Sequence, residues 1–398
     1  MNLKSIMYTF LIAVMTLGLC FNVYADENIN TDLDDYIVIH NADELSSIGE
    51  NLAGRYILAN HIDISSISTW EPIGSQNNPF TGILNGNGYS VVNMKSHNGL
   101  FGYVNKAKIE NLGFINCDIT CSTISKVVGC LSNVAIGSTI VNCFSFGKIY
   151  ASTGSSLTAI AVEYASGSLV GYANNSRFIN CYSLTENILS YEKTPFANMG
   201  GLVGISENSQ YSCCYNIGEV AANKPVNNES SDNNIYLGDL IGFIEEGNSF
   251  VSCYEIQNTV CPVGNADESI TGIVSLPENE LLISSSYEGF DFVDDWYTSE
   301  LTSPRLRTEK PLLKSELNLK YREKASPALY GNVVVSDWQS NKPNVAIVSN
   351  NEIEAIGKGE TTIRILTEEN LYGEIKVTVS YTWWQSIIIY FLFGWLWY

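Results

Sequence analysis

Histidine is scarce in this sequence, and the motifs of common hydrolases are missing. The chain of 398 residues contains only three histidines, His40, His61 and His97. None of them stands in a His-Glu-x-x-His arrangement, which holds zinc in metallopeptidases. There is no Gly-x-Ser-x-Gly nucleophile elbow and no phosphate-binding loop. The sequence therefore predicts no catalytic, cofactor-binding or metal-binding residues, and we expect a protein that is not an enzyme.

Positive charge is also sparse. Charged residues make up 16% of the chain, and 21 basic residues face 42 acidic ones, which leaves a net charge of −21. This balance argues against nucleic acid or anionic lipid as a partner. Grouped carboxylates could instead serve a polysaccharide lyase or hydrolase, which is the alternative interpretation. The candidate acids stand singly or in turn-like pairs and are Asp34, Asp35, Asp63, Asp118, Asp291, Asp294 and Asp295.

Long apolar runs at helical spacing are missing between Leu100 and Val260, which argues against helices there. Instead, a glycine-leucine step is followed fourteen or fifteen residues later by an asparagine-cysteine-tyrosine step, in five copies. The third residue of each copy is a leucine, namely Leu100, Leu131, Leu169, Leu202 and Leu240. Such repetition is typical of stacked coils in which no unit buries its apolar face alone. It predicts a parallel β-helix with an inward leucine ladder and with glycines at corners that need positive φ or close backbone approach.

This phrase resembles the GLUG repeat of bacterial surface proteins. The match lies in residues 200–204 followed by Cys214-Tyr215, and in residues 169–171 followed by residues 180–183. Segments before the repeats resemble the entry region of such solenoids, at residues 42–45, 54–63, 70–74, 80–82 and 85–89. The resemblance covers roughly residues 36–305 and implies a β-helical fold. GLUG repeats also accompany metallopeptidases that cleave immunoglobulin A1, but this chain lacks their zinc motif.

The cysteines follow the repeat as well. The chain has ten, and nine remain if Cys20 is removed with a signal peptide, so they cannot all pair internally. Cys143, Cys181, Cys214 and Cys253 share one position of the repeat. Because an unpaired cysteine is a small hydrophobe that is readily buried, the spacing predicts a column of inward thiols. A disulfide between adjacent turns and a metal site are the weaker alternatives.

The two ends of the chain differ from the repeats. Residues 1–25 have the features of a secretory signal, with Lys4 before an apolar stretch, and predict export to the cell surface. Residues 337–348 followed by residues 354–363, with a Gly-x-Gly turn, resemble the group 2 bacterial Ig-like domain and imply a small sandwich. Residues 383–398 carry no charge and have aromatic residues at both ends, which predicts interfacial or near-spanning membrane insertion.

These observations predict an all-β chain, a parallel β-helix followed by a small Ig-like β-sandwich. The expected domains are a signal peptide (1–25), an N-terminal cap with the first turns (26–96), the GLUG-type solenoid (97–260), a C-terminal cap and linker (261–314), the Ig-like domain (315–380) and a hydrophobic aromatic tail (381–398). We expect a secreted or cell-surface protein that serves adhesion through a β-helical rod. Its expected partner is an extracellular glycan or a host or bacterial surface protein, with no nucleic acid and with envelope association through the tail.

Removal of the tail tests that association. A chain that stops at Ser380 should appear in the culture medium, whereas the full chain should stay with the membrane fraction, because burial of the tail's apolar surface stabilises the bound state. Cell fractionation followed by immunoblotting measures the distribution. Equal release of the two forms would contradict the tether.

Overall fold

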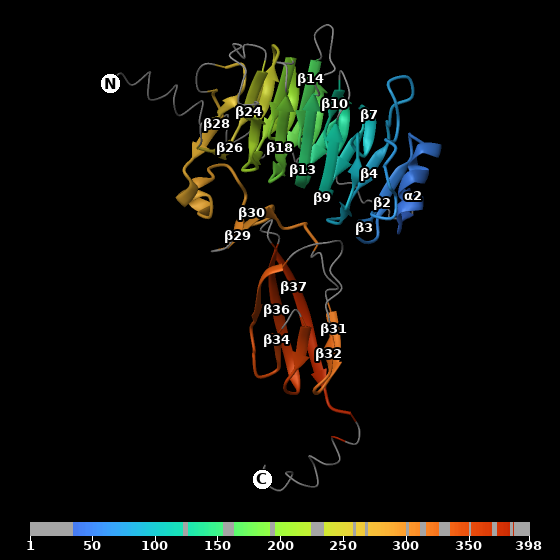
Figure 1. Cartoon of the computed structure of the whole chain (residues 1–398), viewed down its shortest axis with the longest axis vertical. Coiled ribbons are helices and arrows are strands. Elements are labelled where there is room, and N and C mark those ends of the chain that lie inside the picture. Colours follow the sequence, from blue (N-terminus) through green and yellow to red (C-terminus); the bar gives the residue numbers. More distant parts are fainter. Residues whose placement is uncertain are drawn as a thin grey trace, which may run out of the picture. The chain divides into compact units, whose positions relative to one another are not determined.

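The computed structural model describes residues 35–121, 126–153, 163–191, 196–223, 235–257, 260–266, 270–299, 302–310, 316–325, 335–349, 352–367, 372–382 and 385. The chain divides into two compact units, Met1–Glu309 and Lys310–Tyr398 (Figure 1). The signal-like residues 1–25 and nearly all of the tail lie outside the described residues. Among the described residues, no helix combines the length and the apolar character that a membrane crossing requires.

Three parallel sheets form the first unit, and we name them sheets A, B and C. Sheet A has eight strands in the order β1-β2-β4-β8-β12-β16-β21-β25. Their bounds are β1 (Ile37–Ile39), β2 (Arg55–Leu58), β4 (Ile83–Asn85), β8 (Lys108–Glu110), β12 (Thr139–Val141), β16 (Arg177–Ile179), β21 (Gln210–Ser212) and β25 (Ser249–Val251).

Sheet B follows the path β28-β26-β22-β17-β13-β9-β5-β3, and β6, β18 and β23 pair beside it. Its strands are β3 (Ile62–Asp63), β5 (Ser90–Val92), β6 (Lys95–Ser96), β9 (Gly113–Cys121), β13 (Phe144–Thr153), β17 (Tyr182–Ser183), β18 (Glu186–Tyr191), β22 (Tyr215–Asn216), β23 (Val220–Asn223), β26 (Cys253–Ile256) and β28 (Ile273–Leu276).

Sheet C follows the path β10-β14-β19-β24-β20-β15-β11-β7, with β27 beside β24. Its strands are β7 (Phe101–Asn105), β10 (Lys126–Val128), β11 (Ser132–Ile136), β14 (Glu163–Gly167), β15 (Val170–Asn174), β19 (Phe196–Gly200), β20 (Val203–Glu207), β24 (Ile235–Ile244) and β27 (Cys261–Val263). Each turn of the chain passes from sheet C to sheet A and then to sheet B, so the expected coil of parallel strands is confirmed.

The leucine ladder lies inside this coil as predicted. Leu100, Leu131, Leu169, Leu202 and Leu240 are all fully buried. Backbone hydrogen bonds join successive members: the N–H of Leu131 donates to the carbonyl of Leu169, the N–H of Leu169 to that of Leu202, and the N–H of Leu202 to that of Leu240, at 2.9–3.0 Å. The repeat spacing therefore places like side chains one above another.

The corners differ in part from the expectation. The left-handed residues that turn the chain from sheet A into sheet B are Asn111, Asn142, Asn180, Cys213 and Ser252, with φ between 51° and 53°. The repeat glycines instead permit close backbone approach. A Cβ on Gly200 would lie 2.0 Å from the carbonyl oxygen of Val203. Asparagine tolerates positive φ better than most residues, which explains its place in the repeat.

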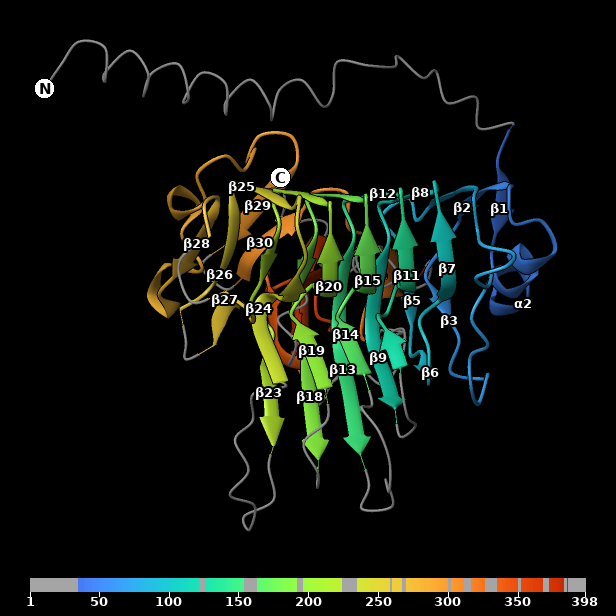
Figure 2. The same cartoon turned by 90° about the horizontal axis from the view of Figure 1, so that it is seen from above.

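The strands of sheet B continue beyond the coil and form a second layer with the first strands of sheet C. This lateral extension contains the far ends of β9 and β13 with β18 and β23, facing β10, β14, β19 and the start of β24 (Figure 2). Asn187 joins the two layers: its Oδ1 accepts from Ser166 Oγ at 2.9 Å, and its Nδ2 donates to the carbonyl of Gly200 at 3.2 Å. Ile149, Leu189 and Met199 form part of the core there.

The N-terminal end of the coil carries α2 (Ala42–Ser46) and η2 (Ser47–Glu50). At the other end, the predicted boundary at residue 260 is wrong, because β27 and β28 pair in parallel with β24 and β26 and continue the coil to Leu276. After them come η3 (Glu278–Glu280), η4 (Ser284–Ser286) and the antiparallel hairpin of β29 (Trp296–Ser299) and β30 (Thr302–Leu306).

Residues 281–309, which we call the return segment, pack along the outer face of sheet B. The expected C-terminal cap and linker spans residues 261–314, and residues 281–309 of it cover the outer face of sheet B. The Trp296 ring lies 6.0 Å from the Tyr182 ring and 5.9 Å from the Tyr215 ring. Arg305 Nη1 donates to Tyr182 Oη at 3.0 Å, and the Tyr182 hydroxyl donates to Glu309 Oε1 at 2.6 Å. The return segment thereby buries the aromatic residues that follow the repeat cysteines.

The second unit contains two sheets around a core of its own. One sheet has the order β31-β37-β36-β33 and the other β32-β35-β34. Their bounds are β31 (Glu316–Lys320), β32 (Lys324–Ala325), β33 (Val335–Ser340), β34 (Ala346–Ser349), β35 (Glu352–Ala355), β36 (Gly359–Thr367) and β37 (Tyr372–Ser380). Side chains from both sheets, among them Ile353, Ile363 and Val377, form one buried cluster.

Truncation of a central ladder residue tests the coil. The substitution Leu202→Ala should lower the free energy of unfolding by about 2–5 kcal/mol, because Leu202 is fully buried and the coil cannot close the resulting cavity. Denaturant titration measures the loss. Val274→Ala, at a side chain that is 46% exposed, is the control, and an equally small change for both variants would contradict the ladder.

Candidate functional site

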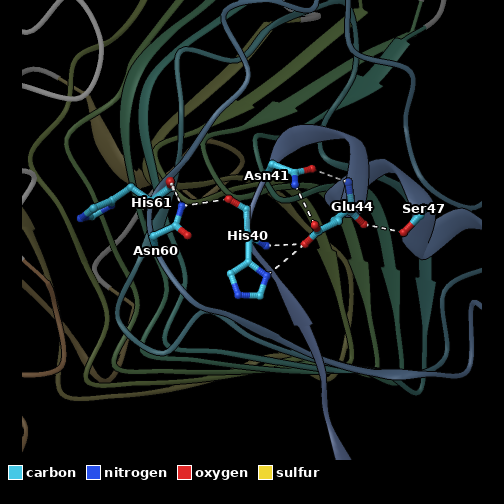
Figure 3. A network of polar contacts seen from close by, with 6 residues as sticks. All are labelled: His40, Asn41, Glu44, Ser47, Asn60 and His61. Carbon is cyan, nitrogen blue, oxygen red and sulfur yellow. Dashed lines mark hydrogen bonds and ion pairs between the residues drawn. The ribbon is translucent and has the colours of Figure 1, made fainter.

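Two of the three histidines belong to a structural network at the start of α2. Asn41 Oδ1 accepts from the backbone N–H of Glu44 at 2.9 Å, and Glu44 Oε2 accepts from the backbone N–H of His40 at 2.7 Å (Figure 3). The same network includes Asn60, whose Nδ2 donates to the carbonyls of His40 and His61. The backbone hydrogen bond from His40 lowers the pKa of the Glu44 carboxyl. This is a reciprocal helix cap.

The remaining histidine contacts are also local. His61 is buried, its Nδ1 accepts from the backbone N–H of Ser90 at 3.1 Å, and its ring meets the edge of Tyr89 at 5.3 Å. His97 contacts the carbonyl of Thr120 through Nδ1. Within the described ranges, no group of three or more His, Cys, Asp or Glu side chains is placed to hold a metal ion.

The acids considered for catalysis lie in separate segments. Asp34 is outside the described residues, and Asp35 lies 3.9 Å from Arg55. Asp63 accepts from Asn93 Nδ2 at 3.2 Å, and Asp118 accepts from Thr120 at 3.3 Å. Asp291 lies in a turn, where its carboxylate accepts from the backbone N–H groups of Val293 and Asp294. Its backbone carbonyl accepts from the backbone N–H of Asp295.

The cysteine column is confirmed. Cys143, Cys181, Cys214 and Cys253 are fully buried and free. Their thiols contact the preceding coil: Cys181 Sγ donates to the carbonyl of Ile140, and Cys214 Sγ to that of Phe178, both at 3.5 Å. Burial raises the pKa of Cys143 to about 12. The column therefore serves packing, and the raised pKa of Cys143 makes that thiol a poor nucleophile and a poor metal ligand.

A pair of buried carboxyl groups lies in the last complete coil. Asp239 of β24 is fully buried, and Glu255 of β26 is 2% exposed. The two carboxyl groups interact electrostatically, and the Ser275 hydroxyl donates to Glu255 Oε1. Burial raises the pKa of the Glu255 carboxyl. The preceding coils have Gly201 and Asn216 at the corresponding positions, so both acids enter together in this coil.

A concave corner runs along the outer face of sheet C. On β24, the Tyr236 and Phe243 rings are 5.0 Å apart, although residues seven apart on a straight strand are separated by about 23 Å. The strand must therefore bend sharply, with both rings on the inside of the bend. In the preceding coils, three further pairs of residues are also seven positions apart: Val127 and Val134, Ala165 and Tyr172, and Asn198 and Ile205.

Two columns in register form the walls of this corner. One column, on the lateral extension, contains Val127, Ala165, Asn198 and Tyr236. The other column, on the coil, contains Tyr103, Val134, Tyr172, Ile205 and Phe243. Tyr103, Tyr172, Tyr236, Ile205 and Phe243 are partly exposed. The corner is thus an apolar and aromatic stripe that remains accessible to a ligand.

Polar groups stand within and beside the stripe. Asn198 is 8% exposed, and its carboxamide has no hydrogen-bond partner in the described part of the chain. Its neighbours Ala197 and Met199 belong to the core, so strand alternation directs Asn198 outward into the corner. Beside the stripe, Glu207 Oε2 accepts from the Tyr172 hydroxyl and from Asn174 Nδ2, both at 2.6 Å. Burial and the hydrogen bond to Glu207 raise the pKa of Tyr172.

Sequence reasoning did not find this corner. The signal was present in four of the five copies as a pair of residues seven apart on either side of the glycine-leucine step, apolar or aromatic except for Asn198. Without the bend, that spacing places the two members of each pair far apart along a strand.

Comparison with known proteins adds little. No family model and no curated protein matches this chain. One solved structure with a similarity is named IgA1 Protease; it is 16% identical with a TM-score of 0.37, and the match covers 60% of this chain and 21% of that chain. The chain thus spans about a fifth of the length of that protein.

The neighbour corrects one expectation. Its printed name is that of an enzyme, which stands against the prediction that this chain is not an enzyme, and that prediction is withdrawn. The likeness is too weak to assign an activity.

The acid pair predicts a pH dependence of stability. Because the folded pKa of Glu255 is raised, the pair contributes stability below the unfolded pKa of about 4.3, and this contribution is lost as the pH rises through the folded value. Glu255→Gln supplies a permanent N–H donor. The free energy of unfolding of the variant, relative to that of the parent, should therefore rise by about 1–3 kcal/mol when the pH is raised from 4.5 to 7.5. Denaturant unfolding at both pH values measures this gain. The exposed control Glu245→Gln should show none, and a gain of the same size in the control would refute the pair.

Proposed function

We propose that the first unit is a ligand-binding scaffold of a secreted or cell-surface protein, and that the concave corner of sheet C binds an extracellular glycan or a surface protein. The observation that carries this proposal is the in-register stripe of partly exposed rings around the unpartnered Asn198. Exposed aromatic residues contribute large contact area at small conformational cost, and a few fixed polar groups orient the ligand.

The rigidity of the coil supports a binding role. Most wall residues of the corner sit on strands that are hydrogen-bonded to a neighbouring strand on both sides, namely β11, β14, β15, β19 and β20. A site on such strands loses little conformational freedom when a ligand binds, which favours affinity. The corner also extends along the coil axis, so it suits an elongated ligand better than a small molecule.

The wider context belongs to the same proposal. Membership of the GLUG-repeat surface proteins, an Ig-like identity of the second unit as a spacer, and an envelope tether by residues 383–398 together describe an adhesion protein. The support is the repeat phrase itself, the two-sheet arrangement of the second unit and the charge-free tail.

An array of glycans and host surface proteins tests this function. The full chain should bind at least one class of ligand, and Phe243→Ala should weaken that binding at least tenfold, since anchor residues contribute most of the affinity. Tyr150 is the matched control because it is 40% exposed on β13, away from the corner, so Tyr150→Ala should leave binding unchanged. Equal effects of the two substitutions would contradict a site at the corner.

A further inference from the structure

The rings of the corner recur with a defined period. Along the coil column, aromatic residues alternate with aliphatic ones: Tyr103, Val134, Tyr172, Ile205 and Phe243 follow one another in register. Neighbouring strands are about 4.8 Å apart, so an aromatic ring returns every second coil, at about 9.6 Å. A ligand that uses all three rings must present equivalent groups at that interval.

Two extended peptide conformations can be compared with this period. A β-strand returns a side chain to the same face every two residues, or about 6.7 Å, and would miss the middle ring, Tyr172, by about 3 Å. A polyproline II helix repeats every three residues at about 3.1 Å per residue, or about 9.3 Å. Over the two intervals from Tyr103 to Phe243, its mismatch is about 0.6 Å.

The polar groups fit the same ligand. The backbone carbonyls of a polyproline II segment make no internal hydrogen bonds, so they need donors from a partner. The outward carboxamide of Asn198 is such a donor, in register with Tyr236 of the next coil. Because the carboxamide has no partner within the described residues, its N–H groups are free to donate to a bound carbonyl.

The negative charge beside the stripe favours polyproline II segments that carry basic residues. Glu207 lies next to Tyr172, and Glu245 and Glu246 follow on from β24 beside Phe243. All three are carboxylates, and Glu245 and Glu246 are exposed. A ligand with basic side chains would meet opposite charge at this end of the corner, whereas an acidic ligand would be repelled.

From these observations, and resting on the proposed binding function, we infer that the corner binds a proline-rich, polyproline II segment of another protein that carries basic residues. The aromatic rings pack between successive turns of the segment, Asn198 donates to one of its carbonyls, and Glu207 with Glu245 and Glu246 pairs with its cations. This places the recognition in the same class as other aromatic-lined grooves for proline-rich peptides.

Isothermal titration calorimetry with the full chain tests this inference. The probe is a twelve-residue peptide of four Pro-Pro-Arg repeats. Two matched peptides have Pro-Pro-Glu repeats, which reverse the charge, and Gly-Ser-Arg repeats, which keep the charge but abolish the polyproline II preference. The Pro-Pro-Arg peptide should bind at least tenfold more tightly than either control. Asn198→Ala and Phe243→Ala should each weaken it about tenfold, and Tyr150→Ala should leave it unchanged.

The contrary results separate the two proposals. Equal binding of the Gly-Ser-Arg peptide would overturn the inference, because charge alone would then explain the affinity. Failure of all peptides, with cellohexaose or chitohexaose binding in a manner that Phe243→Ala weakens, would overturn the inference and leave the proposed function intact. Failure of every peptide and of every ligand in the array would overturn both. Circular dichroism of each variant confirms that a loss of binding is not a loss of folding.

Discussion

Parallel backbone pairing between successive coils is the constraint on which the rest of this structure depends. Because each strand bonds in register to the strand one coil away, every side chain meets its counterpart at a separation of about 4.8 Å. Positions that face inward therefore form columns of like residues. Leucines and cysteines form two of them. A third consists of hydroxyls, in which the Oγ of Ser138, Ser176 and Ser209 accepts the backbone N–H of the preceding coil at 3.1–3.2 Å. Polar backbone at a buried corner is thus satisfied by the same periodicity that packs the core.

The same constraint produces aromatic columns on the outer faces of the sheets, and these columns differ in how far they are exposed to solvent. Phe144, Tyr182 and Tyr215 stack face to face along sheet B at 5.0–5.2 Å, and the return segment buries them with Trp296 and Arg305. The column on sheet C keeps its rings partly exposed, at the inside of a bend where glycines allow two backbones to approach. The column on sheet B thus packs against the return segment of the same chain, whereas the column on sheet C presents apolar surface to a partner. A stripe that is accessible, periodic and flanked by carboxylates has the properties of an interaction surface.

The last complete coil departs from the repeat at two buried positions. In this coil, Asp239 and Glu255 replace small or neutral residues and interact electrostatically in the interior. A single acid there would be an unpaired buried carboxyl, whereas two acids can share one proton. Burial raises the pKa of the Glu255 carboxyl, so the stability of this coil depends on pH.

The spacing of the repeat was sufficient to predict the coil, the leucine ladder and the thiol column, because each of these depends only on which residues recur at one position. It did not predict that residues 281–309 would cover the aromatic face of sheet B, since the expectation was a cap on the open end of the coil. The contact of Tyr182 with Trp296 depends on the direction in which the chain returns, and no periodicity encodes that direction. The corner depends on a bend that brings Tyr236 onto Phe243, and Asn198 acquires its role only because its neighbours on the strand face the core. The sequence alone determined which residues stack, since stacking is a property of one repeat length. The tertiary structure decided which columns are covered and which are open, since that is settled by contacts between segments that share no repeat.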